Sequence, residues 1–211
     1  MNTRVFLSAF FLFFMASAAL FPSVAFSSET SEEVGELNPF NPDVEQFLNE
    51  FDAIYERETG LSAHPDGFID DLTSDALRTC YRQSCRVWAL VSRADQKLYL
   101  YQNGKMTHSW LVSTGMKGYT TPRFDRHPNG RIYDRYSSKA YPGGDYRGLG
   151  NMPYAVFIQG GFALHGTPEA NWHLLGRRAS HGCIRQHPDN GLYFNRLVRS
   201  VGIRNVWITV E

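Results

Sequence analysis

The chain has 211 residues, with 21 Lys and Arg against 21 Asp and Glu, and 43% of its residues are hydrophobic. This ordinary globular composition excludes collagen, coiled coil and wholesale disorder. Aromatic residues make up 14% of the chain, which suits a core rich in β structure. Three cysteines are too few for a disulfide-stapled miniprotein or a four-cysteine zinc module.

The zero net charge conceals two regions of opposite sign. Residues 26–79 carry fourteen acids and two bases, a net −12, whereas residues 80–211 carry seven acids and eighteen bases, a net +11. A basic body favours a partner or substrate rich in carboxylates or phosphates, although solvated surface charge behind an acidic linker would give the same numbers. The bases are scattered and no nucleic-acid motif is present, so no nucleic-acid partner is expected.

Residues 1–25 have the pattern of a secretory signal peptide. Arg4 precedes an uninterrupted apolar stretch that runs to Leu20, and Ser23 and Ala25 are small residues at the −3 and −1 positions of a cleavage site. An anchoring helix is the alternative, but the apolar run is slightly short and lacks basic residues after it. We therefore expect an exported protein without stable membrane insertion after cleavage of the signal.

Export bears on the three cysteines, because disulfides persist in oxidising compartments. Cys80 and Cys85 are predicted to close a small loop, although the sequence cannot test the geometry that such a bond needs. Cys183 is then the single remaining thiol, of the kind that is often reactive.

Two segments are predicted between the signal peptide and these cysteines. Residues 26–40 are polar and acidic, and we expect a disordered leader. Residues 41–79 are predicted to be helical and to pack against the main body. Asn41 is the expected cap and Pro42 the expected first residue of a helix that ends at Gly60.

After a second short helix predicted over 74–80, the hydrophobic period changes to two from Arg86, which is typical of strands. Asn103-Gly104 predicts a hairpin turn, because both residues tolerate positive φ. Residues 116–153 show no periodicity, and a loop of this length in a compact domain is usually functional or flexible. Predicted strands cover 87–91, 98–101, 106–112, 154–158, 162–165 and 206–210, and a last helix ends near Gly202. This pattern predicts a mainly β, mostly antiparallel domain with a few helices.

The candidate chemistry lies in two segments of the basic body. His165 closes a predicted strand, and the run Ser-His-Gly-Cys-Ile-Arg occupies 180–185. A thiol, whose ordinary pKa is about 8.5, needs a base to form thiolate at neutral pH, and His165 and His181 are candidates to serve Cys183. Gly182 lets the backbone turn tightly beside the sulfur, which can aim amide N–H groups at a developing oxyanion.

In their order and spacing, these residues resemble the signature of the L,D-transpeptidase catalytic domain, the YkuD family. The resemblance covers roughly residues 86–211. It rests on the segments His165-Gly166-Thr167, Ser180-His181-Gly182-Cys183-Ile184-Arg185, Leu98 to Lys105, Ser113-Thr114-Gly115 and Thr121-Pro122. The family usually continues Thr-Pro-x-Gly with a short link to the next strand, whereas Arg123-Phe124 and a long insertion follow here.

The resemblance implies a β-sandwich-like fold and a reaction on peptidoglycan stem peptides. Members of the family cut the amide between the L-centre of diaminopimelate or lysine and a terminal D-alanine, through a thioester that an amine resolves. By position, Cys183 would be the nucleophile and His165 the general base and acid, with the Gly166 carbonyl orienting its ring. Arg185 and Tyr154 would contact the donor stem. No metal or cofactor is required, and a carbapenem is expected to add to the cysteine.

Several of these residues also have structural interpretations. Ser180 is expected to support the turn through hydroxyl bonds to the backbone. His181 fits a structural or a catalytic role equally well. His165, His181, Cys183 and His187 could in principle ligate zinc, but their spacing is not that of a structural zinc site. The histidines at 64, 108, 127 and 173 are expected at the surface.

The sequence therefore predicts a periplasmic L,D-transpeptidase, with a second stem or an envelope protein as the acyl acceptor. Water as the acceptor would make it a carboxypeptidase or amidase instead. A wall-binding module without activity is a rival that needs neither His165 nor Cys183. The opposite charges further suggest that residues 26–79 lie over the basic body and restrain substrate entry.

Overall fold

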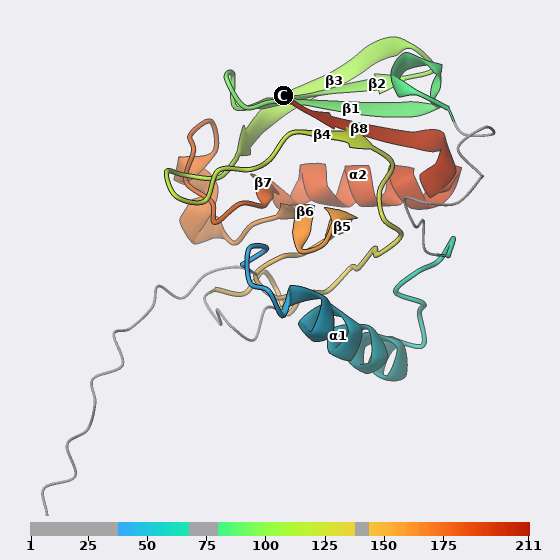
Figure 1. Ribbon diagram of the computed structural model, residues 1–211, viewed down its shortest axis with the longest axis vertical. Helices are drawn as coiled ribbons and strands as arrows, with labels where there is room; N and C mark the ends of the chain where they lie inside the picture. The colour runs from blue at the N-terminus through green and yellow to red at the C-terminus, as the bar shows by residue number, and fades with distance from the viewer. Residues whose placement is uncertain (1–37, 68–79, 138–143) are drawn as a thin grey trace, which may run out of the picture. The chain divides into compact units, whose positions relative to one another are not determined.

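The computed structural model describes residues 38–67, 80–137 and 144–211, which belong to one compact unit (Figure 1). The predicted signal peptide and most of the acidic leader lie outside these residues, as does the second predicted helix except for Cys80. Within the described ranges, no helix is long and apolar enough to cross a membrane.

Helix α1 (Val44–Thr59) begins two residues later than the sequence predicts. Its N-cap is Asp43, and Asn41 instead forms a local turn in which its Oδ1 accepts a hydrogen bond of 2.9 Å from the backbone N–H of Asp43. Gly60 ends the helix with a left-handed φ of 67°, as predicted. The helix buries one face, formed by Val44, Leu48 and Tyr55.

Eight strands form one sheet in the described residues, in the order β4-β8-β1-β2-β3-β7-β6-β5. The pairs β1–β8 and β6–β7 are parallel and the others antiparallel, which confirms a mainly β, mostly antiparallel fold. The strands are β1 (Val87–Ser92), β2 (Lys97–Gln102), β3 (Lys105–Ser113), β4 (Phe124–Arg126), β5 (Val156–Gln159), β6 (Phe162–Gly166), β7 (Ile184–Gln186) and β8 (Val206–Val210).

Two of these strands differ from the sequence prediction. Strand β4 lies inside the segment 116–153, where no periodicity was visible, and pairs with β8. Strand β7 is formed by the end of the Ser-His-Gly-Cys-Ile-Arg motif and pairs with both β3 and β6. Both strands are only three residues long, too short to show a period of two. The predicted hairpin turn is present, with φ of 49° at Asn103 and 75° at Gly104.

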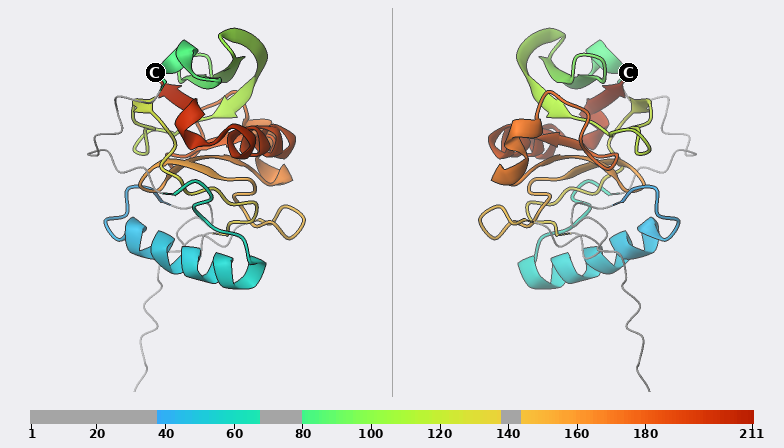
Figure 2. Two further views of the ribbon diagram at one scale, coloured as in Figure 1. Left: turned by 90° about the vertical axis from the view of Figure 1, so that its right-hand side faces the viewer. Right: turned by 90° about the vertical axis from the view of Figure 1, so that its left-hand side faces the viewer.

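The strands β5, β6 and β7 separate two hydrophobic cores because their side chains alternate between two faces. Leu164 and Ile184 belong to the larger core, which helix α2 (Pro188–Val201) shares through Phe194 and Val198. Ala163 belongs to the second core, together with the buried face of α1. Figure 1 and the two views of Figure 2 show α1 on the side of β5 and β6 away from the β1–β2–β3 strands.

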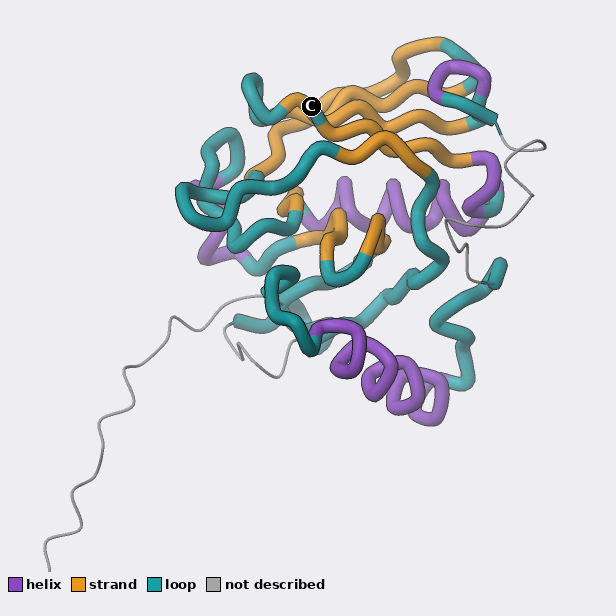
Figure 3. Tube along the Cα trace, in the orientation of Figure 1, coloured by secondary structure: helices purple, strands orange, loops and turns teal. Residues whose placement is uncertain are grey.

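The described parts of the long connection between β4 and β5 are mostly loop, and the part around Arg131 lies beside α1 (Figure 3). Arg131 in this loop is 3% exposed at its side chain and bonds three residues of α1. His127, at the start of the same loop, corrects the expectation that it lies at the surface. It is buried, and its Nδ1 lies 2.6 Å from the carbonyl oxygen of Val206.

Cys80 and Cys85 are joined by a disulfide, as the sequence predicts, around the 3-10 helix η2 (Arg82–Ser84). Asp125 on β4 connects η2 to β8 through hydrogen bonds. Its carboxylate accepts hydrogen bonds from Arg82 in η2 and from Trp207 and Thr209 on β8. Two further short 3-10 helices are η3 (Glu169–Leu174) and η4 (Ile203–Asn205).

Candidate thiol–imidazole site

The parallel pairing of β6 and β7 brings the two chemical segments of the sequence together. His165 lies opposite Arg185 in the register, and Leu164 lies opposite Ile184. Cys183 directly precedes β7, two residues before Arg185, and the alternation of the strand extended by one residue places its side chain on the face of Arg185 and His165. The membership of the cores agrees, because Ile184 lies in the larger core and Cys183 in the second one. An imidazole and a thiol therefore occupy one face of two neighbouring strands.

The ring of His165 is fixed by the backbone of the next residue. Its Nδ1 lies 2.7 Å from the carbonyl oxygen of Gly166, which can only accept, so Nδ1 carries the proton. In the neutral ring, Nε2 is then the basic nitrogen. Gly166 is held in turn by its own N–H, which donates to the carbonyl of Pro153 at 2.7 Å. A Cβ on Gly166 would lie 2.9 Å from the Cα of Pro188, so only glycine fits this approach.

Cys183 is the cysteine that forms no disulfide, and it is fully buried, as is His165. Its Sγ donates a hydrogen bond of 3.3 Å to the carbonyl oxygen of Gly161, in the turn before β6. Burial of a free cysteine fits a small apolar residue as well as a protected nucleophile. The polar neighbour and the shared face with His165 distinguish this site from an ordinary core position.

Ser180 shapes the turn that carries the sulfur. Its Oγ donates to the carbonyl of Cys183 at 2.6 Å and accepts from the N–H of Gly182 at 3.1 Å. Gly182 has a φ of +119°, a conformation that favours glycine. The N–H of Gly182 is thus donated to Ser180, which leaves Cys183 itself as the better candidate for the predicted oxyanion donor.

Thr121 links this turn to the upstream segment of the resemblance. Its Oγ1 donates to the carbonyl of Gly182 at 2.7 Å and accepts from the N–H of Gly115 at 2.8 Å. The backbone N–H groups of Ala179 and Ser180 both donate to the carbonyl of Thr114. Thr121 belongs to the segments that carry the resemblance, but its hydrogen bonds to the Cys183 turn were not predicted from the sequence.

The other predicted site residues occupy different settings. His181 is half-buried, and its ring meets that of Tyr119 edge-on at 4.9 Å. Arg185 is 5% exposed, and its Nη1 donates to the carbonyl of Ala179 at 3.0 Å. Tyr154 directly follows the residue that accepts from Gly166, and it adopts a positive φ of 59°. Contact of a substrate with the buried Arg185 requires a rearrangement.

Tyr136 is a neighbour of the sulfur that sequence reasoning missed. It is buried in the core that also contains Cys183. Burial raises the pKa of Tyr136, and the nearby charges of Cys183 and Asp52 raise this pKa further. Its hydroxyl therefore stays protonated and can act as a hydrogen-bond donor. The only signal in the sequence was the abundance of tyrosine in the aperiodic segment.

Residues of the N-terminal segment cover the glycines beside the sulfur. A Cβ on Gly161 would lie 2.6 Å from Cγ2 of Val44 and 2.8 Å from Cα of Pro39. A Cβ on Gly182 would lie 2.9 Å from both Cε2 of Phe40 and Cγ of Pro39. The sequence placed Pro39 and Phe40 in a disordered leader, and the structure corrects this for both residues.

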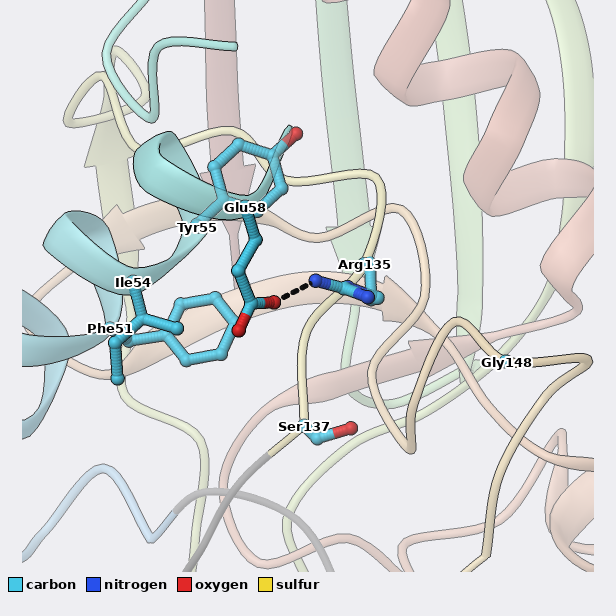
Figure 4. Close-up of a pocket in the computed structure, with 7 residues that line it drawn as sticks. All are labelled: Phe51, Ile54, Tyr55, Glu58, Arg135, Ser137 and Gly148. Carbon is cyan, nitrogen blue, oxygen red and sulfur yellow. Dashed lines mark hydrogen bonds and ion pairs between the residues drawn. The ribbon is translucent and has the colours of Figure 1, made fainter. Parts of the chain in front are cut away.

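A cavity of about 260 Å³ lies between α1 and the loop before β5 (Figure 4). Arg135 and Glu58 form an ion pair across it. It is lined by Phe51, Ile54, Tyr55, Glu58, Arg135, Ser137 and Gly148. Since neither His165 nor Cys183 lines it, this cavity is separate from the thiol–imidazole site. In the parts of the chain that the structure describes, no group of three His, Cys, Asp or Glu side chains could hold a metal ion.

The fold and the site define a β-rich domain with a thiol and an oriented imidazole on one face of paired strands. Residues 86–206, more than half of the chain, match the YkuD family, the L,D-transpeptidase catalytic domain. The chain therefore belongs to this family. The match confirms the resemblance of the sequence and begins at the predicted residue.

Solved structures of other proteins are similar to part of the chain. An L,D-transpeptidase from Mycobacterium smegmatis is 20% identical with a TM-score of 0.49, and the match covers 61% of this chain and 59% of that one. An L,D-transpeptidase from Mycobacterium tuberculosis H37Rv is 20% identical with a TM-score of 0.47, covering 61% and 58%. The chain thus spans about three fifths of the length of these proteins. No curated protein sequence gave a significant match.

Proposed function

We propose that this protein is an exported peptidoglycan L,D-transpeptidase that uses Cys183 as its nucleophile. The observation that carries the proposal is that the parallel pairing of β6 and β7 brings His165 on β6 and Cys183, directly before β7, to one face of a YkuD-family domain. A domain that only binds the cell wall would need neither a thiol nor an imidazole with a fixed tautomer.

The first half of the proposed reaction transfers the donor stem to the enzyme. Nε2 of His165 takes the proton of the Cys183 thiol, and the sulfur attacks the carbonyl carbon of the stem's third residue. The N–H of Cys183 stabilises the oxyanion. The amide bond to D-alanine then breaks, and the imidazolium of His165 returns its proton to the departing amine. The product is a thioester on Cys183 and free D-alanine.

The second half releases the stem to an acceptor. The amine of a second stem attacks the thioester carbonyl, Nε2 of His165 takes a proton from that amine, and the bond to sulfur breaks. The thiolate is restored when the new amide forms, which gives a 3→3 cross-link. Gly166 keeps the His165 ring in the tautomer that both halves need, since its carbonyl holds the Nδ1 proton.

Other predicted residues would serve the donor stem. Stem peptides carry several carboxylates, which fits the net positive charge of residues 80–211. Arg185 pairs in register with His165 and would meet a donor carboxylate once it is uncovered. His181 lies at the rim of the Cys183 turn, and Tyr154 follows the proline that holds Gly166. We assign Arg185 and Tyr154 to stem binding, and His181 stays a site residue with a structural or catalytic role.

Two observations support export to the periplasm. The first is the charged, apolar and small-residue pattern of residues 1–25. The second is the Cys80–Cys85 disulfide, a bond that persists in oxidising compartments and is rare in the cytosol.

Incubation with a disaccharide-tetrapeptide, followed by mass spectrometry, tests the proposal. A cross-linked dimer that Cys183→Ala does not form is the expected result. A tripeptide product without dimer would identify water as the acceptor and make the enzyme a carboxypeptidase. Unchanged substrate with the wild type as well as with Cys183→Ala would instead favour a wall-binding module.

A further inference from the structure

We propose that residues 38–59, here called the covering segment, form an autoinhibitory cover on the catalytic face, which substrate must displace. The inference rests on the proposed function, because it concerns access to the same sulfur. The covering segment comprises the turn from Asn38 to Asp43 and helix α1. Cys183 and His165 are both fully buried, and Cys183 belongs to the core that Val44, Leu48 and Tyr55 of this segment help to form.

The tightest contacts of the cover fall on two glycines that flank the sulfur. Gly161 supplies the carbonyl that accepts from Cys183, and the three atoms nearest to a Cβ built on it belong to Val44 and Pro39. Gly182 directly precedes Cys183, and the two nearest atoms to its Cβ belong to Phe40 and Pro39. The covering segment therefore lies against bare backbone on both sides of the nucleophile, where a stem peptide would have to approach.

Phe40 extends the cover over the rim of the site. Its ring meets Phe162 edge-on at 5.2 Å and Tyr119 at 6.3 Å, and Tyr119 in turn meets His181. Phe40 is nevertheless 46% exposed. Phe40 therefore buries only part of its apolar area in this contact. Displacing it into water costs less free energy than displacing a fully buried core residue.

An electrostatic clamp holds the helical part of the cover. Three α1 residues, spaced to lie on one helix face, accept hydrogen bonds from the buried guanidinium of Arg131. Glu45 Oε2 accepts from Nη1 at 2.8 Å, Asp52 Oδ2 from Nε at 3.1 Å and Asn49 Oδ1 from Nη2 at 2.5 Å. Asp52 also bonds Tyr133 and His64. A carboxylate-rich ligand could take over these polar contacts of Arg131, whereas the apolar contacts of Val44, Leu48 and Tyr55 in the second core also have to open.

The chemistry of the cover matches that of the substrate it excludes. Residues 38–59 carry six acids and one base, and a stem peptide is acidic as well. Both would be attracted to the basic body, so substrate and cover compete for the same face. A free energy difference of a few kcal/mol between closed and open states would keep the thiol protected until substrate binds.

The chain offers a direct readout, because its other two cysteines are bonded to each other and Cys183 is the one cysteine outside a disulfide. The native full-length mature protein is treated with iodoacetamide, and alkylation of Cys183 is followed by mass spectrometry. Two variants loosen the cover: Phe40→Ala removes its rim contact, and Gly161→Ala places a Cβ against Val44 and Pro39. Phe47→Ala, 42% exposed on the outer side of α1, is the matched control.

We expect Phe40→Ala and Gly161→Ala each to speed alkylation at least about tenfold, which corresponds to ~1.4 kcal/mol of easier opening. Phe47→Ala should stay within about twofold of the wild type, since single surface substitutions change stability little. Circular dichroism identifies variants that have unfolded, and Phe40→Ala serves if Gly161→Ala does not fold.

The results separate the cover from the proposed chemistry. Faster alkylation with faster cross-linking supports both, and faster alkylation without any turnover supports the cover while contradicting the transpeptidase. If the folded Phe40→Ala variant is alkylated no faster than Phe47→Ala, the cover is overturned, whatever the turnover. The cover is also overturned if wild-type Cys183 reacts as fast in the native protein as it does in urea.

Discussion

The Sγ atom of Cys183 donates a hydrogen bond of 3.3 Å to the carbonyl oxygen of Gly161, and Val44 and Pro39 occupy the space that a side chain on Gly161 would need. The structure is therefore a closed state. The thiol proton is engaged with a backbone carbonyl, and this bond has to be given up before the sulfur can attack a substrate. Gly161 links the attack of the sulfur to the displacement of the covering segment. Its carbonyl accepts the hydrogen bond from the thiol, and its lack of a side chain lets the covering segment pack against it.

Substitution of the two central residues should affect the reaction differently. Cys183→Ser should abolish the thioester and any covalent carbapenem adduct. His165→Asn should leave the thiol in place but slow its acylation about 10²–10⁴-fold, the usual contribution of a general base. Acylation is measured by intact mass after mixing with a carbapenem, which adds without loss of atoms when its lactam ring opens. An undiminished rate in His165→Asn would remove His165 from the mechanism.

Ser180→Ala should destabilise the turn that carries the sulfur. The substitution removes the donor to the Cys183 carbonyl and the acceptor of the Gly182 N–H in a buried setting. Leaving such groups unsatisfied costs about 1–3 kcal/mol. Ser200→Ala is the matched control, because the Ser200 hydroxyl also donates to a backbone carbonyl but lies at the surface. Urea unfolding measures both, and equal losses would show that the Ser180 bonds are not special.

The clamp on Arg131 gives a prediction about the stability of α1 docking. Arg131→Met leaves Asp52, whose side chain is 15% exposed, without its buried ion-pair partner, and the loss of one partner of a buried ion pair costs about 3–5 kcal/mol. Arg135→Met breaks a pair with Glu58 whose side chains are 42% and 48% exposed, which should cost under ~1 kcal/mol. Thermal unfolding should therefore shift far more for Arg131→Met. Similar shifts would mean that the buried clamp holds the helix no better than a surface pair does.

Much of the fold was predictable because it depends on local patterns. Period-two alternation located β1 and β2, the Asn103-Gly104 turn joined β2 to β3, and Gly60 ended α1. Strands of three residues could not be recognised in this way. The pairing of β7 with β6 involves residues about twenty positions apart, and nothing in the local sequence fixes its register.

The sequence predicted the reactive groups of the site but not their burial. The resemblance gave His165, Gly166 and Cys183, and the Gly166 carbonyl lies where the resemblance implied. Gly161 and Gly182, the glycines beside Cys183, lie against Pro39, more than 120 residues earlier in the chain. Gly161 resembled an ordinary turn glycine in the sequence, whereas the structure shows that its missing side chain makes room for the cover.

The carboxylate of Asp125 should make stability depend on acid pH. Burial raises the pKa of Asp125, but the hydrogen bonds from Arg82, Trp207, Thr209 and Tyr81 outweigh burial and hold the pKa at about 2. An unfolded aspartate has a pKa of about 3.9. The folded state therefore binds this proton less readily than the unfolded state. The resulting stabilisation is fully present above about pH 4 and is lost as the pH falls toward 2.

Urea unfolding at a series of pH values from 2 to 6 measures this effect. The difference in unfolding free energy between the wild type and Asp125→Asn should be largest above pH 4 and shrink toward pH 2, because carboxylates common to both proteins cancel. Trp207→Phe removes one of the donors, at 2.8 Å, and should give a smaller pH dependence of the same sign. Parallel curves for the wild type and Asp125→Asn between pH 2 and 4 would show that Asp125 titrates alike in the folded and unfolded chains, and that its hydrogen bonds do not hold β4 and η2 in place.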